Sequence, residues 1–189
     1  DALRLQLFSP ARAMTEDDIA RAVAEFAHAA RLAIEAGFDG VELHAANGYL
    51  IEQFLNPLVN QRTDGYGGDI PGRNRFALEV TQAVCAAIGA DRVGIRLSPY
   101  GVFNGTGAFA DVDAQYLALC EALSALGLLY LHVLDHAAMG APPVPEALKV
   151  QLRERFDGPF ILAGGFDRAT AEAALAEGRA DLIAFGRPF

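Results

Sequence analysis

The feature that most constrains the fold is a fivefold alternation of helical and extended segments along the chain. Apolar residues recur at helical spacing near residues 15–36, 73–88, 112–126, 145–156 and 168–177. Each helical segment is followed by a short, mostly apolar run typical of a strand, near residues 40–44, 92–98, 129–133, 159–165 and 180–186. This alternation produces right-handed βαβ units, so we predict an α/β fold with about five parallel strands.

The first helix carries signals for both of its ends. Thr15 and Asp18 are three residues apart, the spacing of a capping box in which each side chain binds the backbone N–H of the other residue. Gly37 follows the last apolar position and is typical of a helix C-terminus. We therefore predict a helix that begins just after Thr15 and ends just before Gly37.

The alternation within the strands distinguishes a barrel from an open, doubly wound sheet. Val93, Ile95 and Leu97 alternate with Gly94 and Arg96, and residues 41–44 alternate in the same way. The apolar set can face helices while the polar set points into a barrel interior. The sequence therefore favours a (β/α)8 TIM barrel, here an incomplete barrel with strands 4–8. No stretch resembles a linker, so we predict one domain over residues 1–189.

Glycine-rich turns follow the last two predicted strands. Gly164 and Gly165 precede a helix that begins near Asp167, and Gly186 and Arg187 follow the final strand. Glycine lets backbone N–H groups approach a phosphate, and arginine adds a fixed cation. Barrels often bind phosphate through the loops after strands 7 and 8. The pair of turns favours a phosphate-bearing ligand, although tight βα turns also need glycine for geometry alone.

Composition excludes several classes of partner. The formal net charge is −9 and the isoelectric point is about 4.8, which disfavours nucleic acid and anionic membrane surfaces. No apolar run is long enough to span a bilayer, and no Cys/His spacing predicts a metal site. Cys85 and Cys120 lie in Ala- and Leu-rich helical stretches, where we expect them to be core residues. The expected location is the cytoplasm.

Three hydrogen-bonding side chains lie within six residues just after the first predicted strand. His44 and Asn47 are three residues apart, so their side chains can converge on one carbonyl or nitro oxygen and stabilise negative charge there. The phenol of Tyr49 can serve as a proton donor. The alternative is that all three satisfy backbone groups of the loop.

Other polar residues in the predicted barrel allow more than one interpretation. Arg96 lies at the carboxyl end of its strand, where it can hold an anionic or electron-rich ring edge or form an ion pair with Glu42. His132 and His136 have no obvious partner in the sequence, and we interpret them as packing or loop residues with a possible role at the rim of the site. We expect His28 to be exposed on the first helix.

Several motifs together resemble the Old Yellow Enzyme family of flavin-dependent ene-reductases. They are, in order, "GFDGVELHAANGYLIEQFLNP", "NQRTDGYGG", "RFALEV", "VGIRLSPYGVFN", "ILAGGF" and "LIAFGRPF". The resemblance extends from about Pro10 to Phe189 with suitable spacing. It implies a (β/α)8 barrel that holds FMN at its carboxyl-terminal mouth.

The resemblance also implies residue roles. His44 and Asn47 would bind the activating oxygen of an unsaturated substrate, and Tyr49 would protonate its α-carbon. Arg96 would contact the pyrimidine edge of FMN. NADH or NADPH would reduce the flavin, which would then pass a hydride to the β-carbon of the alkene. The residues implied for the FMN phosphate are Gly164, Gly165, Gly186 and Arg187.

The sequence departs from the family pattern in what it lacks. It has no counterpart of the family's first strands, which carry a Thr or Cys near the flavin and a Gln against its ring. We therefore expect half of an active site, and either self-association or a complementing N-terminal barrel segment. The alternatives to an ene-reductase are another FMN barrel oxidoreductase and a half-barrel that catalyses nothing.

Overall fold

Five parallel strands form one sheet, and their order in the sheet follows their order in the chain. The strands are β1 (Val41–Ala45), β2 (Val93–Leu97), β3 (Tyr130–Leu134), β4 (Phe160–Ala163) and β5 (Leu182–Ala184). The structure is a computed structural model that describes residues 11–186. A doubly wound sheet reverses its strand order at a switch point, whereas a barrel adds each strand beside the last. The consecutive order therefore confirms the prediction of part of a barrel.

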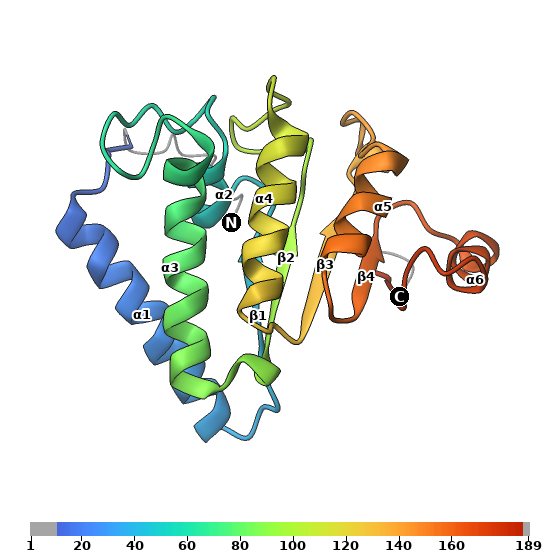
Figure 1. The fold of residues 1–189 in the computed structure, drawn as a ribbon, viewed down its shortest axis with the longest axis horizontal. Helices are drawn as coiled ribbons and strands as arrows, with labels where there is room; N and C mark the ends of the chain where they lie inside the picture. The colour runs from blue at the N-terminus through green and yellow to red at the C-terminus, as the bar shows by residue number, and fades with distance from the viewer. Residues whose placement is uncertain (1–10, 187–189) are drawn as a thin grey trace, which may run out of the picture.

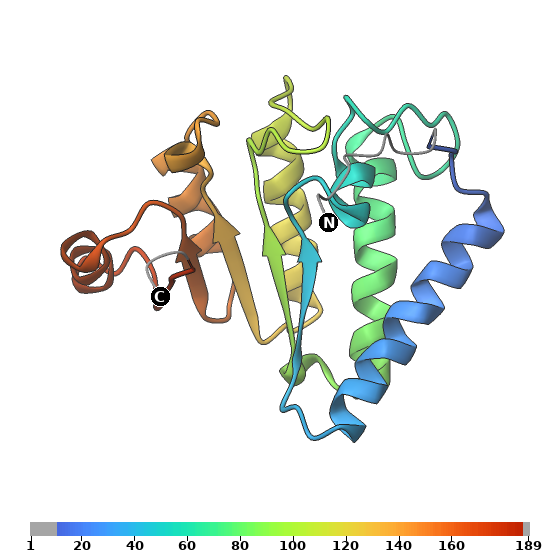
Figure 2. The same ribbon diagram turned by 180° about the vertical axis from the view of Figure 1, so that it is seen from behind.

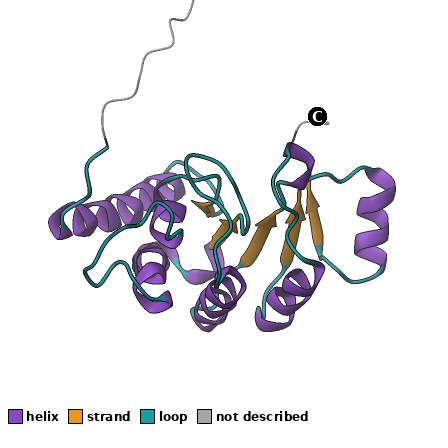
Figure 3. Ribbon diagram, turned by 90° about the horizontal axis from the view of Figure 1, so that it is seen from above, coloured by secondary structure: helices purple, strands orange, loops and turns teal. Residues whose placement is uncertain are grey.

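The helices cover one face of this sheet. They are α1 (Glu16–Glu35), α2 (Leu50–Leu55), α3 (Ile70–Ile88), α4 (Val112–Ala125), α5 (Glu146–Arg155) and α6 (Arg168–Ala176), with short 3-10 turns at Ala90–Arg92 and Ala137–Met139. Figure 1 shows α4 and α5 in front of the strands, with α3 beside them. Figure 2 shows β1, β2 and β3 from the other side, with no helix in front of them. In the view from above in Figure 3, helices lie along one side of the strands and one further helix lies beside the end of the sheet.

The alternation within the strands explains why only one face is covered. Val93, Ile95 and Leu97 of β2 are completely buried in the core that joins the sheet to its helices. Successive side chains of a strand point to opposite faces, so Gly94 and Arg96 lie on the uncovered face. Each fully buried aliphatic side chain stabilises the fold by about 1.5–3 kcal/mol. The covered face therefore supplies stability, and the uncovered face is left for polar groups.

Local capping sets the helix boundaries. The Thr15 hydroxyl accepts a hydrogen bond from Asp18 N at 3.1 Å, and Thr15 N donates to the Asp18 carboxylate at 3.0 Å. The predicted capping box is therefore confirmed, as is the helix end before Gly37, which has a φ of +95°. Helix α3 begins three residues before the prediction, because Asp69 accepts from Gly72 N at 3.0 Å and caps an earlier turn.

One helix of the structure has no counterpart in the sequence predictions. Helix α2 was not predicted, because its six residues lie between the turn after β1 and a glycine-rich loop and are too few to show helical periodicity.

Cys120 is buried and Cys85 half-buried, and both are free thiols packed in or against the core, as predicted. Among residues 11–186, no helix combines the length and apolar character needed to cross a membrane.

Candidate active site

Polar side chains from three neighbouring strands lie at the same level of the uncovered face. In the strand register, His44 of β1 is opposite Arg96 of β2, and Arg96 is opposite His132 of β3. Two residues earlier along β1, on the same face, the Glu42 carboxylate lies 2.9 Å from His132 Nδ1. Parallel strands present their carboxyl ends at one edge, so these groups gather where a barrel has its mouth.

The Arg96 guanidinium is the least satisfied of these groups. Its Nε is buried and has no hydrogen-bond partner within residues 11–186. In the described chain the Glu42 carboxylate is bound to His132, and no ion pair joins it to Arg96. The ion-pair alternative for Arg96 is therefore wrong, and a buried donor is left facing the barrel interior. A ligand with an acceptor at this position would satisfy it.

The environment of His44 keeps its imidazole neutral. Burial lowers the pKa of His44, and the nearby positive charge of Arg96 lowers it further, while Glu42 opposes both effects. A neutral imidazole carries one N–H donor and one acceptor nitrogen. The His44 and Tyr49 rings lie side by side, with their centroids 5.4 Å apart and a tilt of 45°. The structure thus brings these two predicted site residues together.

Tyr49 is the most accessible member of the group. Its side chain is 55% exposed, and its hydroxyl has no hydrogen-bond partner among the described residues. As the N-cap residue of α2, it makes no side-chain capping bond. Within the described residues, nothing therefore supports the alternative that the Tyr49 side chain satisfies backbone groups of the loop.

Asn47 is fixed by hydrogen bonds that come from two different loops, the one after β2 and the one after β3. Its backbone N–H donates to the Ser98 hydroxyl at 2.9 Å, and its carbonyl accepts from Asn104 Nδ2 at 2.9 Å. Its side-chain Oδ1 lies 2.9 Å from His136 Nε2. Asn47 has a φ of +61°, a left-handed conformation that asparagine tolerates better than most residues. Its Nδ2 is left without a partner within residues 11–186.

The buried carboxyl group of Glu52 stabilises the turn that contains Asn47 and Gly48. Glu52 is 1% exposed and accepts hydrogen bonds from Gly48 N, from the Ser98 hydroxyl at 2.7 Å and from the Tyr116 hydroxyl at 3.2 Å. Burial raises the pKa of Glu52, and the three hydrogen bonds oppose that effect. Gly48 has a φ of +71°, and a Cβ there would lie 2.1 Å from the carbonyl oxygen of Phe103. The turn therefore requires glycine for conformation and for space.

Both histidines interpreted as packing or loop residues are buried, and both also have polar partners. His132 is bound to Glu42 and His136 to Asn47, partners that are not obvious in the sequence. Their partners are 90 and 89 residues away in the chain. Only the strand register and the approach of the loops reveal them. His28 is exposed on α1, as predicted.

The first glycine turn has the geometry of a close backbone approach. Gly164 has a φ of +106°, and a Cβ there would lie 1.9 Å from the carbonyl oxygen of Asp135. Gly165, with a φ of +71°, donates no backbone hydrogen bond within the described chain. The Asp167 carboxylate caps α6 by accepting from Thr170 N at 2.8 Å. An anion at this turn would therefore meet the glycine backbone rather than free donors of α6.

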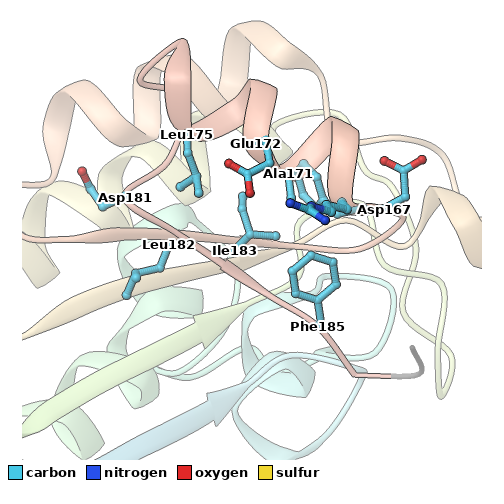
Figure 4. Close-up of a pocket in the computed structure, with 10 residues that line it drawn as sticks. Asp167, Ala171, Glu172, Leu175, Asp181, Leu182, Ile183 and Phe185 are labelled. Atoms are coloured by element: carbon cyan, nitrogen blue, oxygen red, sulfur yellow. The ribbon is translucent and has the colours of Figure 1, made fainter. Parts of the chain in front are cut away.

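The second turn is only partly described. Gly186 is exposed at the end of the described chain, and Arg187 lies outside the described residues. A separate cavity of about 680 Å³ lies between α6 and β5. Figure 4 shows Leu175 and Ala171 of α6 above Ile183, with Phe185 beside them. This cavity is mainly apolar and lies away from His44 and Asn47.

Comparisons with known proteins agree with this geometry. Residues 3–189 match the NADH:flavin oxidoreductase / NADH oxidase family, and the chain belongs to that family. It is 46% identical over 184 residues to 12-oxophytodienoate reductase 2 of Arabidopsis thaliana, and the matched region covers 96% of this chain and 49% of that protein. It is 46% identical over 187 residues to chanoclavine-I aldehyde reductase ifgG of Penicillium roqueforti (strain FM164), covering 95% of this chain and 50% of that protein.

Solved structures show the same relationship. The structure of morphinone reductase superimposes with a TM-score of 0.93 at 42% identity, over 98% of this chain and 50% of that one. An Old Yellow Enzyme homologue from Zymomonas mobilis superimposes with a TM-score of 0.91 at 38% identity. The resemblance to the Old Yellow Enzyme family is therefore confirmed, and the chain spans about half the length of the relatives it matches.

Replacement of Ser98 by alanine tests the support of the Asn47 turn. Ser98 is completely buried, and its hydroxyl accepts from Asn47 N while donating to Glu52. Loss of this hydroxyl removes one hydrogen-bond partner from the Asn47 N–H and one from the Glu52 carboxylate. We therefore expect the free energy of unfolding to fall by about 1–3 kcal/mol. Denaturant unfolding measures this change. Ser124→Ala is the matched control, because that hydroxyl bonds only exposed Asp157, and an equal loss in both variants would contradict the prediction.

Proposed function

We propose that this chain supplies the substrate-oxygen clamp and the phosphate turns of an FMN-dependent reductase of activated alkenes such as enones, maleimides and nitroalkenes. The observation that carries the proposal is the pair of donors beside Tyr49. His44 is neutral and retains an N–H, and Asn47 has its Nδ2 free while its other polar atoms are bound. The names of the relatives support reduction chemistry, since they include 12-oxophytodienoate and morphinone reductases.

The residues present fit FMN. The buried, unpartnered Nε of Arg96 can donate to an acceptor on the edge of the flavin ring. The unbonded amide of Gly165 can donate to a phosphate oxygen, and Gly186 and Arg187 would complete that site. When bound, FMN supplies the hydride chemistry that none of these side chains can perform. NADH or NADPH would be the reductant, and a morphinone reductase structure in complex with tetrahydroNAD supports a nicotinamide.

The side chains of this chain would bind the substrate and move a proton. Two neutral donors, from His44 and Asn47, would hold the activating oxygen and stabilise the negative charge that develops on it as the alkene is reduced. The Tyr49 hydroxyl would then donate a proton to the α-carbon. Its exposure and its lack of an internal partner leave it available to a substrate at the mouth.

We also propose that the open edges of the sheet are covered in the working protein. Within residues 11–186, β1 pairs only with β2 and β5 only with β4, so each has a free edge. Leu182 and Phe185 beside the β5 edge are 55% and 38% exposed. Open edges with apolar neighbours favour association. Self-association or a complementing N-terminal barrel segment would cover them.

The proposed location is the cytoplasm. Both cysteines are free thiols, which suits a reducing compartment.

Tyr49→Phe separates proton donation from the rest of the reaction. In the complete FMN-loaded barrel, we expect slower oxidation of reduced flavin by an enone and nearly unchanged flavin reduction by NADPH, because only the first of these steps needs the phenol proton. General acid catalysis contributes about 10²–10⁴-fold. Stopped-flow absorbance of the flavin measures both half-reactions. An equal fall in both would exclude the proton-donor role, and absence of any flavin spectrum would contradict the proposed function itself.

His44→Ala tests the oxygen clamp. A phenol presents an oxygen that mimics the charge developing on the substrate, and loss of one hydrogen bond to a charged group costs about 1.5–3 kcal/mol. We therefore expect phenol to bind the FMN-loaded barrel about 10- to 150-fold more weakly. Titration monitored by flavin absorbance gives the dissociation constant. His28→Ala, an exposed histidine on α1, is the control, and unchanged phenol affinity in His44→Ala would remove this residue from the clamp.

The open edges predict the behaviour of the chain by itself. We expect light scattering on the purified chain to show dimers or larger species, because five strands cannot close a barrel that needs eight. Addition of a segment that supplies the missing strands should convert these species to a single complex. A compact monomer with stoichiometric FMN and enone reductase activity would contradict this prediction.

A further inference from the structure

His136 lies just beyond β3, at the start of the 3-10 turn Ala137–Met139, and it reaches across to the turn that follows β1. Its side chain is buried, with only 2% of the residue exposed, and its Nε2 lies 2.9 Å from Asn47 Oδ1. The edge of its ring packs against Phe103, with centroids 4.7 Å apart and an interplanar angle of 69°. Burial and packing leave this imidazole little freedom to rotate.

The surroundings of the imidazole determine which nitrogen carries the proton. Nδ1 is buried and has no hydrogen-bond partner within residues 11–186. A proton on Nδ1 would be a buried, unpaired N–H donor, which is rarer and more costly than an unpaired acceptor lone pair. Burial and the charge of Arg96 lower the pKa of His136, whereas Asp135 raises it, and the net effect favours the neutral ring. The proton therefore lies on Nε2, which donates to Asn47 Oδ1.

This donation fixes the orientation of the Asn47 amide. An asparagine amide can rotate by about 180° about χ2, which exchanges its oxygen and nitrogen. With Oδ1 held by His136, Nδ2 is the end that points to the substrate side. In the reversed orientation Oδ1 would face the substrate oxygen, and two acceptors would repel each other. The backbone bonds of Asn47 to Ser98 and Asn104 hold its position but do not select between the two orientations.

We propose that His136 is a positioning residue that selects the amide orientation of Asn47 and so makes the oxygen clamp a donor. The inference rests on the proposed function, because it assumes that Asn47 Nδ2 binds the substrate oxygen. It adds a residue from the loop after β3 to a clamp that otherwise comes from β1 and the turn after it. His136 acts through Asn47 and need not touch the substrate.

A double-mutant cycle with phenol as the probe tests this role in the complete FMN-loaded barrel. His136→Phe keeps a planar ring and removes the donor, so the amide is no longer immobilised, and we expect phenol to bind about 3- to 10-fold more weakly. Asn47→Ala should weaken binding at least as much. In the Asn47→Ala background, His136→Phe should have no further effect on the dissociation constant, because the group that it orients is absent. His136→Gln, which can donate from a similar position, should restore most of the affinity.

The outcomes separate this inference from the proposed function. Unchanged phenol affinity in Asn47→Ala would overturn the proposed clamp and the inference with it. Weaker binding in Asn47→Ala with unchanged affinity in His136→Phe would overturn the inference alone. Independent, additive losses would also overturn it, because a general packing defect would weaken binding whether or not Asn47 were present. Thermal unfolding and FMN affinity of each variant identify a folding defect, and the His136→Gln rescue decides between lost donation and lost packing.

Discussion

The buried carboxylate of Glu52 is the interaction on which the candidate site depends. It accepts hydrogen bonds from Gly48 N and from the hydroxyls of Ser98 and Tyr116, which come from the turn after β1, the end of β2 and helix α4. Ser98 is held by Glu52 and in turn accepts from Asn47 N. A buried carboxylate is tolerable only with such partners. One side chain therefore joins three elements and, through Ser98, supports the left-handed conformation of Asn47.

The one-sided sheet explains where the chemistry is placed. The apolar face of β2 is completely buried under the helices, so it cannot accept a polar group without losing stability. The other face carries Glu42, His44, Arg96 and His132, and in a closed barrel it would be the interior. Strand register brings three of these side chains to one level; Glu42 is bound to His132, and the buried Arg96 Nε has no hydrogen-bond partner within residues 11–186. The pairing of β1, β2 and β3 therefore assembles the site and leaves the Arg96 guanidinium available to a ligand.

The sequence could predict the features that depend on local pattern. Strand alternation and helix periodicity predicted five parallel strands, and the Thr15–Asp18 spacing predicted the first helix boundary. The grouping of His44, Asn47 and Tyr49 at the carboxyl end of one strand was also apparent. The sequence could not show that Ser98 and Glu52 support Asn47, because these contacts join residues 46 and 51 positions apart. Nor could it show the His136–Asn47 bond, which requires the loops after β1 and β3 to meet.

The unsatisfied donors suggest why ligand binding and stability should be linked in this protein. Within residues 11–186, Arg96 Nε is buried without a hydrogen-bond partner, and Asn47 Nδ2 has no partner while the other polar atoms of Asn47 are bound. An unpaired buried donor costs about 1–3 kcal/mol, and a charged one costs more. That cost is recovered only when an acceptor arrives, so a ring edge at Arg96 or an oxygen at Asn47 would bind the folded state and not the unfolded one. Ligands at the uncovered face would therefore raise the free energy of unfolding.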